Sequence, residues 1–238
     1  MKTIYLNLKR FDIPSDLGGI NNIGFADTWA RKIVTDLNSI TDFDIVIFLP
    51  ESSIIPAIKS TKHIAIGCEG VHYKDVAKGG NFGAFTSFRP ASCMKALGVS
   101  YALIGHSEER AYLNDILSLG GGKGDVNEIL NAEVECARAQ GLKVLYCIGE
   151  KAEEQSRKEE VISHQIKTGL NGVDLKDVSL AYEPIWAIGP GKTPPGKEYI
   201  ESMSLFIKSV IDLPVVYGGG LKEENAEMLA SIPSLDGG

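Results

Sequence analysis

The chain has 238 residues, of which 44% are hydrophobic and 23% charged, with a formal net charge of −7 at pH 7. This balance is typical of a soluble globular protein and excludes disorder as the main state, because disordered chains combine low hydrophobicity with high charge. No apolar run approaches the roughly 18–20 residues that span a bilayer, and the acidic balance argues against a nucleic-acid partner. The first residues turn polar too early for a signal peptide, so we expect an intracellular protein.

Seven short segments of the chain are rich in apolar, β-prone residues. Each is nearly continuous rather than alternating, as expected for strands of a parallel sheet that are buried on both faces. The predicted strands are 3–6, 44–49, 63–68, 99–104, 143–148, 178–182 and 214–217.

Helical periodicity fills the gaps between these strands. Apolar residues three or four positions apart give one apolar face to residues 26–37 and another to 126–139, and residues 198–211 and 223–232 follow the same pattern. A strand followed by a helix, repeated seven times, predicts one α/β domain with a parallel sheet. A doubly wound open sheet and a closed (βα)₈ barrel both fit this pattern. The first strand is not followed by GxGxxG, which favours the barrel.

The cysteines and the charged runs offer little evidence of a site. Zinc sites and disulfide frameworks show tight cysteine spacing, and no CxxC pair occurs here, so we expect neither a metal site nor a disulfide. Free cysteines behave as small hydrophobic residues, so we expect reduced, mostly buried thiols. We interpret the charged run 150–160 as the solvated face of a helix. The cysteines are Cys68, Cys93, Cys136 and Cys147.

Residues that could carry chemistry lie where the predicted strands end, which is where α/β folds place their active sites. Asn7 and Lys9 follow the first strand and, two positions apart, should share one of its faces. His106 follows the fourth strand, and Ser107 should cap a helix whose N-terminus keeps the imidazole neutral. Taken alone, Lys9 also fits a solvated surface charge, and His106 also fits a hydrogen-bonded structural histidine.

Glu183 ends the sixth strand, where apolar surroundings should raise its pKa and suit it to act as a general base. Segment 184–193 follows it and is apolar. Such a loop is costly on a surface unless it closes over something, so we expect a lid that excludes water, with a permanently packed loop as the alternative. Residues 218–220 are all glycine and lead into a helix, where bare amides form an anion site, typically for phosphate.

Together these segments resemble the triosephosphate isomerase family, and the resemblance covers nearly the whole chain in order. The Glu183 segment is the most specific. The matching motifs are Asn-Leu-Lys at 7–9, Gly-Ala-Phe-Thr at 83–86, Ile-Gly-His-Ser-Glu at 104–108, Cys-Ile-Gly-Glu at 147–150, Tyr-Glu-Pro-Ile-Trp-Ala-Ile-Gly at 182–189 and Tyr-Gly-Gly at 217–219. The family implies a (βα)₈ barrel, of which seven βα units are visible here.

The resemblance also implies an activity and a setting for it. The family interconverts dihydroxyacetone phosphate and D-glyceraldehyde 3-phosphate, a cytoplasmic step of glycolysis and gluconeogenesis, without cofactor or metal. Its small phosphosugar substrate is the expected ligand, and neither nucleic acid nor membrane is an expected partner. A homodimer is the expected assembly.

Carried over by position, the resemblance assigns roles to residues of this chain. Glu183 would move a proton between adjacent carbons, and neutral His106 would polarise the carbonyl. Lys9 would supply a fixed positive charge, with Asn7 holding an oxygen of the substrate. Glu108 would lie behind Lys9 as its partner. The amides expected at the phosphate are those of Gly189, Gly219 and Gly220.

Several positions depart from the family pattern. Arg10 and Phe88 stand where the family has other residues near its dimer interface, so we expect an altered interface. Pro190 replaces a threonine at the second hinge of the lid, and Gly220 replaces a serine that helps to latch it. The family's eighth strand has no visible counterpart before residue 238, so either the barrel is incomplete in this chain or its closure is made in another way.

Two further functions stay open. A related isomerase of a four-carbon ketose phosphate would use the same base, imidazole and lysine, with the altered lid making room. A non-catalytic relative that binds phosphate or a partner would not need a base. The joint presence of Asn7, Lys9, His106 and Glu183 counts against that second alternative.

Overall fold

The computed structural model describes residues 2–80, 83–189 and 191–238, and in them parallel strands alternate with helices. The chain divides into two compact units. Unit 1 comprises Met1–Leu103 and Cys136–Lys143, and unit 2 comprises Ile104–Glu135 and Val144–Gly238. A single domain stays a prediction. Within the described residues, no helix is both long and apolar enough to cross a membrane.

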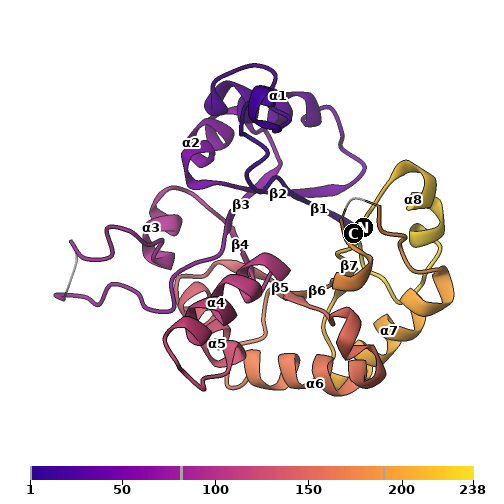
Figure 1. The fold of residues 1–238 in the computed structure, drawn as a ribbon. Coiled ribbons are helices and arrows are strands. Elements are labelled where there is room, and N and C mark those ends of the chain that lie inside the picture. The colour runs from indigo at the N-terminus through magenta and orange to yellow at the C-terminus, as the bar shows by residue number, and fades with distance from the viewer. Residues whose placement is uncertain (1, 81–82, 190) are drawn as a thin grey trace. The chain divides into compact units, whose positions relative to one another are not determined.

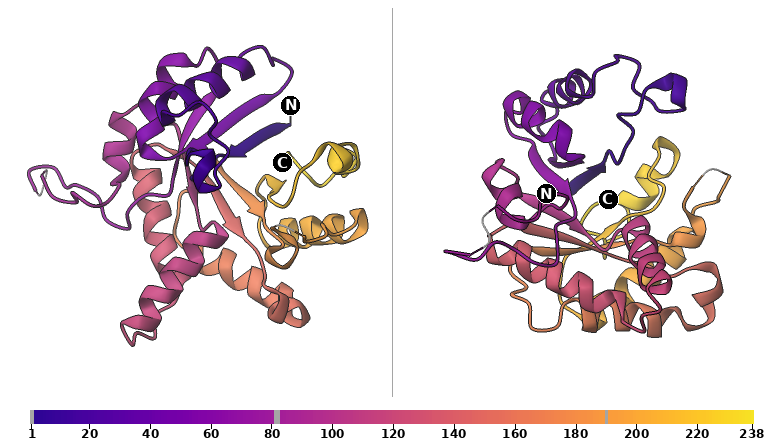
Figure 2. Two further views of the ribbon diagram at one scale, coloured as in Figure 1. Left: turned by 45° about the horizontal axis from the view of Figure 1, so that its top comes forward. Right: turned by 60° about the vertical axis from the view of Figure 1, so that its left-hand side comes forward.

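Unit 1 pairs its strands in parallel and in chain order, from β1 through β4. Helices α1 and α2 pack against each other beside β1 and β2, as the indigo and purple ribbons of Figures 1 and 2 show. The apolar face of α1 buries Trp29, Ala30 and Val34. The elements are β1 (Thr3–Asn7), the short helix η1 (Ser15–Leu17), α1 (Ala26–Leu37), β2 (Asp44–Leu49), α2 (Glu51–Ser60), β3 (Ala65–Glu69), α3 (Ala91–Ala96) and β4 (Tyr101–Ile104).

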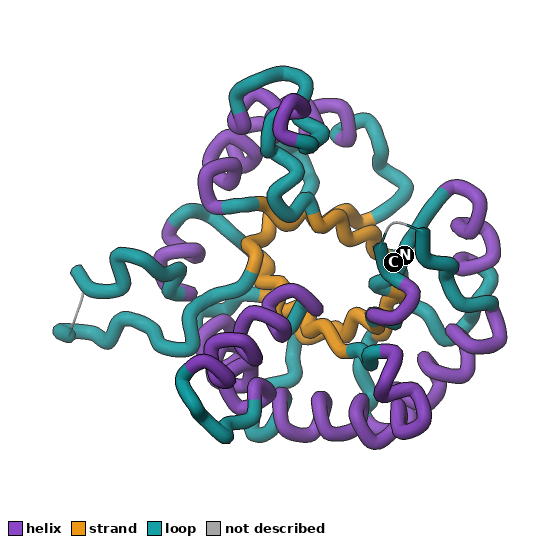
Figure 3. The backbone as a smooth tube through the Cα atoms, in the orientation of Figure 1, coloured by secondary structure: helices purple, strands orange, loops and turns teal. Residues whose placement is uncertain are grey.

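Unit 2 pairs β5, β6 and β7 in parallel. Helices α6 and α7 pack together and α7 contacts β7, so helices flank the strands, as the purple and orange tubes of Figure 3 show. The end of α5, from Cys136, and the first residue of β5 are assigned to unit 1. The elements are α4 (Ser107–Leu119), α5 (Val126–Ala139), β5 (Lys143–Ile148), η2 (Ala152–Arg157), α6 (Lys158–Gly169), β6 (Val178–Tyr182), η3 (Ile185–Ala187), α7 (Lys197–Val210), β7 (Val215–Tyr217) and α8 (Glu223–Ala230).

The segment after α8 returns to the edge of β7, which the sequence pattern did not reveal. Gly237 forms a parallel bridge with Val216, and the N–H of Asp236 donates to the carbonyl of Val215 (2.8 Å). The carboxylate of Asp236 also accepts from the Val215 N–H (2.8 Å) and pairs with Lys208 (2.7 Å). Residues 236–237 therefore lie beside β7 where an eighth strand would begin. Residues 235–237 lack the continuous apolar run by which the other strands were recognised.

The predicted elements agree closely with the observed ones. The strands predicted at 44–49, 143–148 and 178–182 are confirmed at both ends. The third strand begins two residues later than predicted, because the Thr61 hydroxyl bonds both the N–H and the carbonyl of Ile64 in a local turn (2.8 and 2.9 Å).

The thiols divide into buried and accessible ones. Cys68 and Cys147 are buried, Cys136 is half-buried and Cys93 is exposed, and all four are free thiols. The expectation of mostly buried thiols therefore holds fully for two of them.

Candidate active site

Glu183 directly follows β6, and its surroundings fix it tightly. Its N–H donates to the carbonyl of Ile148 at the end of β5 (2.8 Å), and only 5% of the residue is exposed. A Cβ on Gly149 would lie 1.8 Å from the carbonyl oxygen of Glu183, and one on Gly218 would lie 2.9 Å from its Cγ. A side chain at either glycine would collide with Glu183, so the backbone and the first part of the Glu183 side chain occupy a narrow slot between the ends of β5 and β7.

The structure brings His106 and Glu183 together, as the sequence predicted. His106 Nε2 lies 3.6 Å from Glu183 Oε1, and both side chains are largely buried. The other carboxylate oxygen accepts a hydrogen bond from the N–H of Ser107 (3.0 Å). A buried carboxylate thus faces an imidazole at the start of α4.

The cap of α4 is His106 rather than the predicted Ser107. His106 precedes the first helical residue, and its Nδ1 accepts a hydrogen bond from the N–H of Glu108 (3.3 Å). An accepting Nδ1 carries no proton, which is the arrangement of a neutral ring with its proton on Nε2. Ser107 was wrongly predicted because hydroxyl side chains are the commonest caps, whereas this helix begins one residue earlier in the chain.

Arg110 holds the His106 loop in place, and no sequence pattern singled it out. The residue is only 8% exposed. Its guanidinium donates to the carbonyls of Gly105 and Cys147 (both 2.8 Å), so it ties the loop before His106 to the end of β5. It also donates to Asn127 Oδ1 (2.7 Å) and to the hydroxyl of Tyr146 (3.1 Å). Its burial is a product of tertiary packing, which local spacing does not encode.

Cys147 lies against the candidate base. Burial raises the pKa of its thiol well above the ordinary value, and the nearby negative charge of Glu183 raises it further. The thiol therefore stays protonated and does not compete with Glu183 as a base.

Glu150 corrects the interpretation of the charged run 150–160. The residue is fully buried, although most of the run that follows it is exposed. Its Oε1 accepts from the Tyr182 hydroxyl (3.0 Å), Trp186 Nε1 (2.8 Å) and the Tyr199 hydroxyl (3.0 Å). The signal that could have found it is its position, because it closely follows the apolar strand β5, as Glu183 follows β6.

The predicted lid, segment 184–193, begins with η3, and residues 188–189 and 191–193 after it belong to no helix or strand. Ala187 is buried, which anchors the first part of the segment. Gly189 and Gly191 have φ of +114° and +75°, conformations that disfavour other residues. Pro190, predicted to alter the hinge, lies outside the described residues.

The glycines at 218–220 form a backbone cradle before α8. The amide of Gly218 donates to the carbonyl of Tyr182 (2.8 Å) and is therefore used. In the described parts of the chain, the amides of Gly219 and Gly220 donate to no protein acceptor. Asn225 fixes the cradle, because its side chain donates to the carbonyl of Gly220 (2.8 Å). These two amides are available for an anion.

Asn7 and Lys9 belong to unit 1 and contact each other. The Lys9 N–H donates to Asn7 Oδ1 (2.9 Å). They do not share a strand face, because β1 ends at Asn7 and Lys9 has a φ of +40°. The sequence pattern extended the strand too far. How these two residues meet His106, Glu183 and Glu108, which belong to unit 2, stays a prediction.

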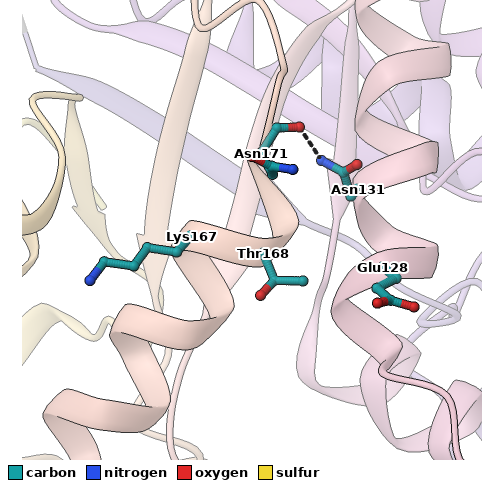
Figure 4. Close-up of a pocket in the computed structure, with 5 residues that line it drawn as sticks. All are labelled: Glu128, Asn131, Lys167, Thr168 and Asn171. Carbon is teal, nitrogen blue, oxygen red and sulfur yellow. Dashed lines mark hydrogen bonds between the residues drawn. The ribbon is translucent and has the colours of Figure 1, made fainter.

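A separate surface pocket of about 290 Å³ opens near α5 and α6 (Figure 4). In it, Asn131 donates to the carbonyl of Asn171 (3.0 Å), and no predicted site residue lines it. No group of three or more His, Cys, Asp or Glu side chains able to hold a metal ion occurs within the described residues. The pocket is lined by Glu128, Asn131, Lys167, Thr168 and Asn171.

Comparison with known proteins adds a consistent finding. Residues 21–238 match the family model described as "TIM: Triosephosphate isomerase". A protein named triosephosphate isomerase from Prosthecochloris aestuarii is 34% identical, over 79% of this chain and 73% of the relative. Proteins of the same name from Carboxydothermus hydrogenoformans (28%, over 97% and 88%) and Alkaliphilus metalliredigens (32%, over 86% and 82%) are also similar.

Proposed function

Because the chain belongs to the triosephosphate isomerase family, we propose that it interconverts dihydroxyacetone phosphate and D-glyceraldehyde 3-phosphate. The reaction moves a proton between two adjacent carbons and a second proton between their oxygens. The observation that carries the proposal is the pairing of buried Glu183 with His106 (3.6 Å). A general base beside a hydrogen-bond donor is what enediolate chemistry requires.

Glu183 is proposed to take the proton from one carbon and to return it to the next. Its backbone is held by the hydrogen bond from its N–H to the carbonyl of Ile148 (2.8 Å) and by close packing against Gly149, which fixes the point from which the carboxylate turns. One oxygen is held by the N–H of Ser107 (3.0 Å). That bond must break when the base turns to the substrate, and the amide then becomes free to bind another oxygen.

His106 is proposed to polarise the carbonyl through Nε2–H and to pass protons between the two oxygens. The acceptor role of its Nδ1 at the start of α4 supports a neutral ring. A neutral imidazole can donate its Nε2 proton to one oxygen and recover a proton from the other, passing through an imidazolate that the hydrogen bond from the Glu108 N–H to Nδ1 would stabilise. Lys9 would supply fixed positive charge to the enediolate and the phosphate, and Asn7 would hold an oxygen.

The phosphate is proposed to bind at the glycine amides. Gly219 and Gly220 precede α8, whose N-terminus favours an anion, and Gly189 would add an amide from the lid. A Cβ at Gly219 would lie 2.3 Å from the Tyr217 hydroxyl, so the cradle requires glycine there. A doubly charged phosphate would thus be held by backbone dipoles, with Lys9 as the proposed cation.

A homodimer with an altered interface is the proposed assembly, and the cytoplasm is the proposed location, as in the family. Phe88 is 57% exposed, and the loop after β1 exposes several apolar side chains. Arg10 pairs with Asp12 of its own unit (3.0 Å), so its charge is partly neutralised before any partner arrives. These features support an interface with contacts of its own.

The test is an isomerase assay on glyceraldehyde 3-phosphate with the unmodified chain, Glu183→Gln and the surface control Glu153→Gln. We expect Glu183→Gln to lower kcat by roughly 10³-fold, in the range of a lost general base, with phosphate binding retained. Glu153→Gln should match the unmodified chain. Turnover of a four-carbon ketose phosphate but not of the triose would contradict the proposal in favour of a related isomerase.

A further inference from the structure

Glu150 lies behind the lid with an uneven set of contacts. All three of its side-chain donors, from Tyr182, Trp186 and Tyr199, bond Oε1. Its Oε2 is buried and makes no hydrogen bond with any residue that the structure describes. A carboxylate oxygen has two lone pairs, so Oε1 has one donor more than it can bond at full strength.

The three donors come from different elements of unit 2. Tyr182 ends β6, and Tyr199 lies in the first turn of α7, so both belong to regular structure. Trp186 belongs to η3, at the start of the predicted lid. Of the three donors, only Trp186 belongs to the predicted lid, so it is the donor that a movement of the lid would take from Oε1.

Tyr199 is built to stay in place. Its ring meets the indole of Trp186 edge-on, with centroids 5.6 Å apart, and Lys158 Nζ lies 4.2 Å from its ring centre. Burial raises the pKa of its hydroxyl, and the negative charge of Glu150 raises it too. The phenol therefore remains a donor at neutral pH.

We propose that Tyr199 is a positioning residue that allows Trp186 to leave Glu150 when η3 moves as phosphate binds. This inference rests on the proposed function. With Tyr199 present, departure of the indole takes Oε1 from three donors to two, which still fill its lone pairs. Without the Tyr199 hydroxyl, departure of the indole reduces the donors to Oε1 from two to one, so the buried carboxylate loses a hydrogen bond. A hydrogen bond to a charged group corresponds to roughly a tenfold change or more in such an equilibrium.

The first experiment follows the indole directly, with inorganic phosphate as the probe. The chain has two tryptophans, so in a Trp29→Phe background the fluorescence reports Trp186 alone. We expect phosphate to shift this fluorescence, and Tyr199→Phe to raise the half-saturating phosphate concentration about tenfold. The matched control is Tyr112→Phe, which removes a hydroxyl from a tyrosine that is 63% exposed on α4 and should change nothing.

The second experiment measures turnover. Tyr199→Phe should lower kcat about tenfold, as expected for slowed lid movement, and this effect should vanish in a Trp186→Phe background, where no indole bond has to break. An unchanged phosphate response in Tyr199→Phe, even with a lower melting temperature, would mean a purely structural role and would overturn the inference. The inference would also be overturned if phosphate did not change the Trp186 fluorescence of the Trp29→Phe chain with Tyr199 intact.

The two proposals fail separately. A chain that shows the phosphate response and its loss in Tyr199→Phe, but no isomerase activity, would contradict the proposed function alone. An active enzyme whose kcat and phosphate response ignore Tyr199→Phe would contradict the positioning role alone.

Discussion

The surroundings of Glu183 in unit 2 contrast with the loop that follows β1 in unit 1. Glu183 is 5% exposed and lies between glycines that admit no methyl group. The loop, residues 10–25, exposes Leu17 to 74% and Phe25 to 80%. A single side chain, Asn21, organises much of the loop through four hydrogen bonds to its backbone.

The difference indicates which parts of the site this chain fixes by itself. Glu183 and His106 are positioned by contacts within unit 2. The loop after Lys9 turns apolar side chains to solvent, and exposed apolar surface of this kind is typical of protein–protein interfaces. We therefore expect substitutions behind Glu183 to act on folding and catalysis, and substitutions in the loop to act on assembly.

The largest effect is expected at Gly149. Gly149→Ala places a methyl group 1.8 Å from the Glu183 carbonyl oxygen, and the backbone must shift to relieve the clash. We expect a loss of roughly 3 kcal/mol or more in the free energy of unfolding, measured by urea denaturation. The control is Gly196→Ala, at φ −72° with open space around it. Equal stabilities for the two variants would contradict the narrow slot.

A smaller loss is expected at Arg110. Arg110→Met keeps the volume of the stem but leaves the carbonyls of Gly105 and Cys147 without these donors. We expect a cost of roughly 2–3 kcal/mol, together with a lower kcat because the His106 loop is no longer tied to β5. Denaturation and the isomerase assay measure the two effects. A stability loss with unchanged kcat would show that the loop holds His106 without this clamp.

The partly exposed pair of Asp125 and His164 also lies in unit 2. It tests whether burial, rather than membership of unit 2, determines how much a substitution destabilises the fold. Burial acts to raise the pKa of Asp125, but hydrogen bonds from Asn127 and His164 outweigh it and lower the pKa. The resulting stabilisation is present above the unfolded value, near 3.8, and is lost as pH falls through the lower folded pKa. We expect Asp125→Asn to cost under about 1 kcal/mol at pH 7 and progressively less as the pH falls below 3.8, as measured by denaturation across pH.

The smallest effect on folding is expected in the loop after β1. Leu17→Ser with Phe25→Ser changes side chains that are already exposed, so the unfolding free energy of the monomer should change by about 0.5 kcal/mol or less. The two changes should instead weaken assembly. We expect a higher dissociation constant for the homodimer, measured in sedimentation experiments. A monomeric unmodified chain, or a dimer indifferent to both changes, would remove the loop from the interface.

Hydrophobic periodicity predicted most of the helices and strands, and position at a strand end pointed to the two candidate catalytic residues that the structure brings together. Helices 26–37 and 126–139 were predicted to the residue, because their apolar faces have the period of the element itself. His106 and Glu183 were singled out because each lies just beyond the carboxyl end of a recognisable strand. The end of β1 was missed because the left-handed turn at Lys9 leaves no mark in hydrophobicity.

The residues that sequence reasoning missed are polar groups buried by tertiary contacts. Glu150 begins a charged run, and its inward direction depends on three donors, the most distant of them Tyr199, 49 positions along the chain. Arg110 depends likewise on carbonyls before and after it in the sequence. Local patterns register how apolar a segment is, but not which distant groups will satisfy a buried charge.

Lys9 is a lysine in a backbone conformation that suits glycine, and this has a consequence for how the position can drift. A positive φ costs a lysine conformational energy, which a glycine at the same place would largely avoid. Selection for heat resistance alone should therefore enrich glycine at position 9, whereas selection for turnover should keep lysine. With the role proposed for Lys9, the two selections would favour different residues at this position, so stability and catalysis would be in conflict there.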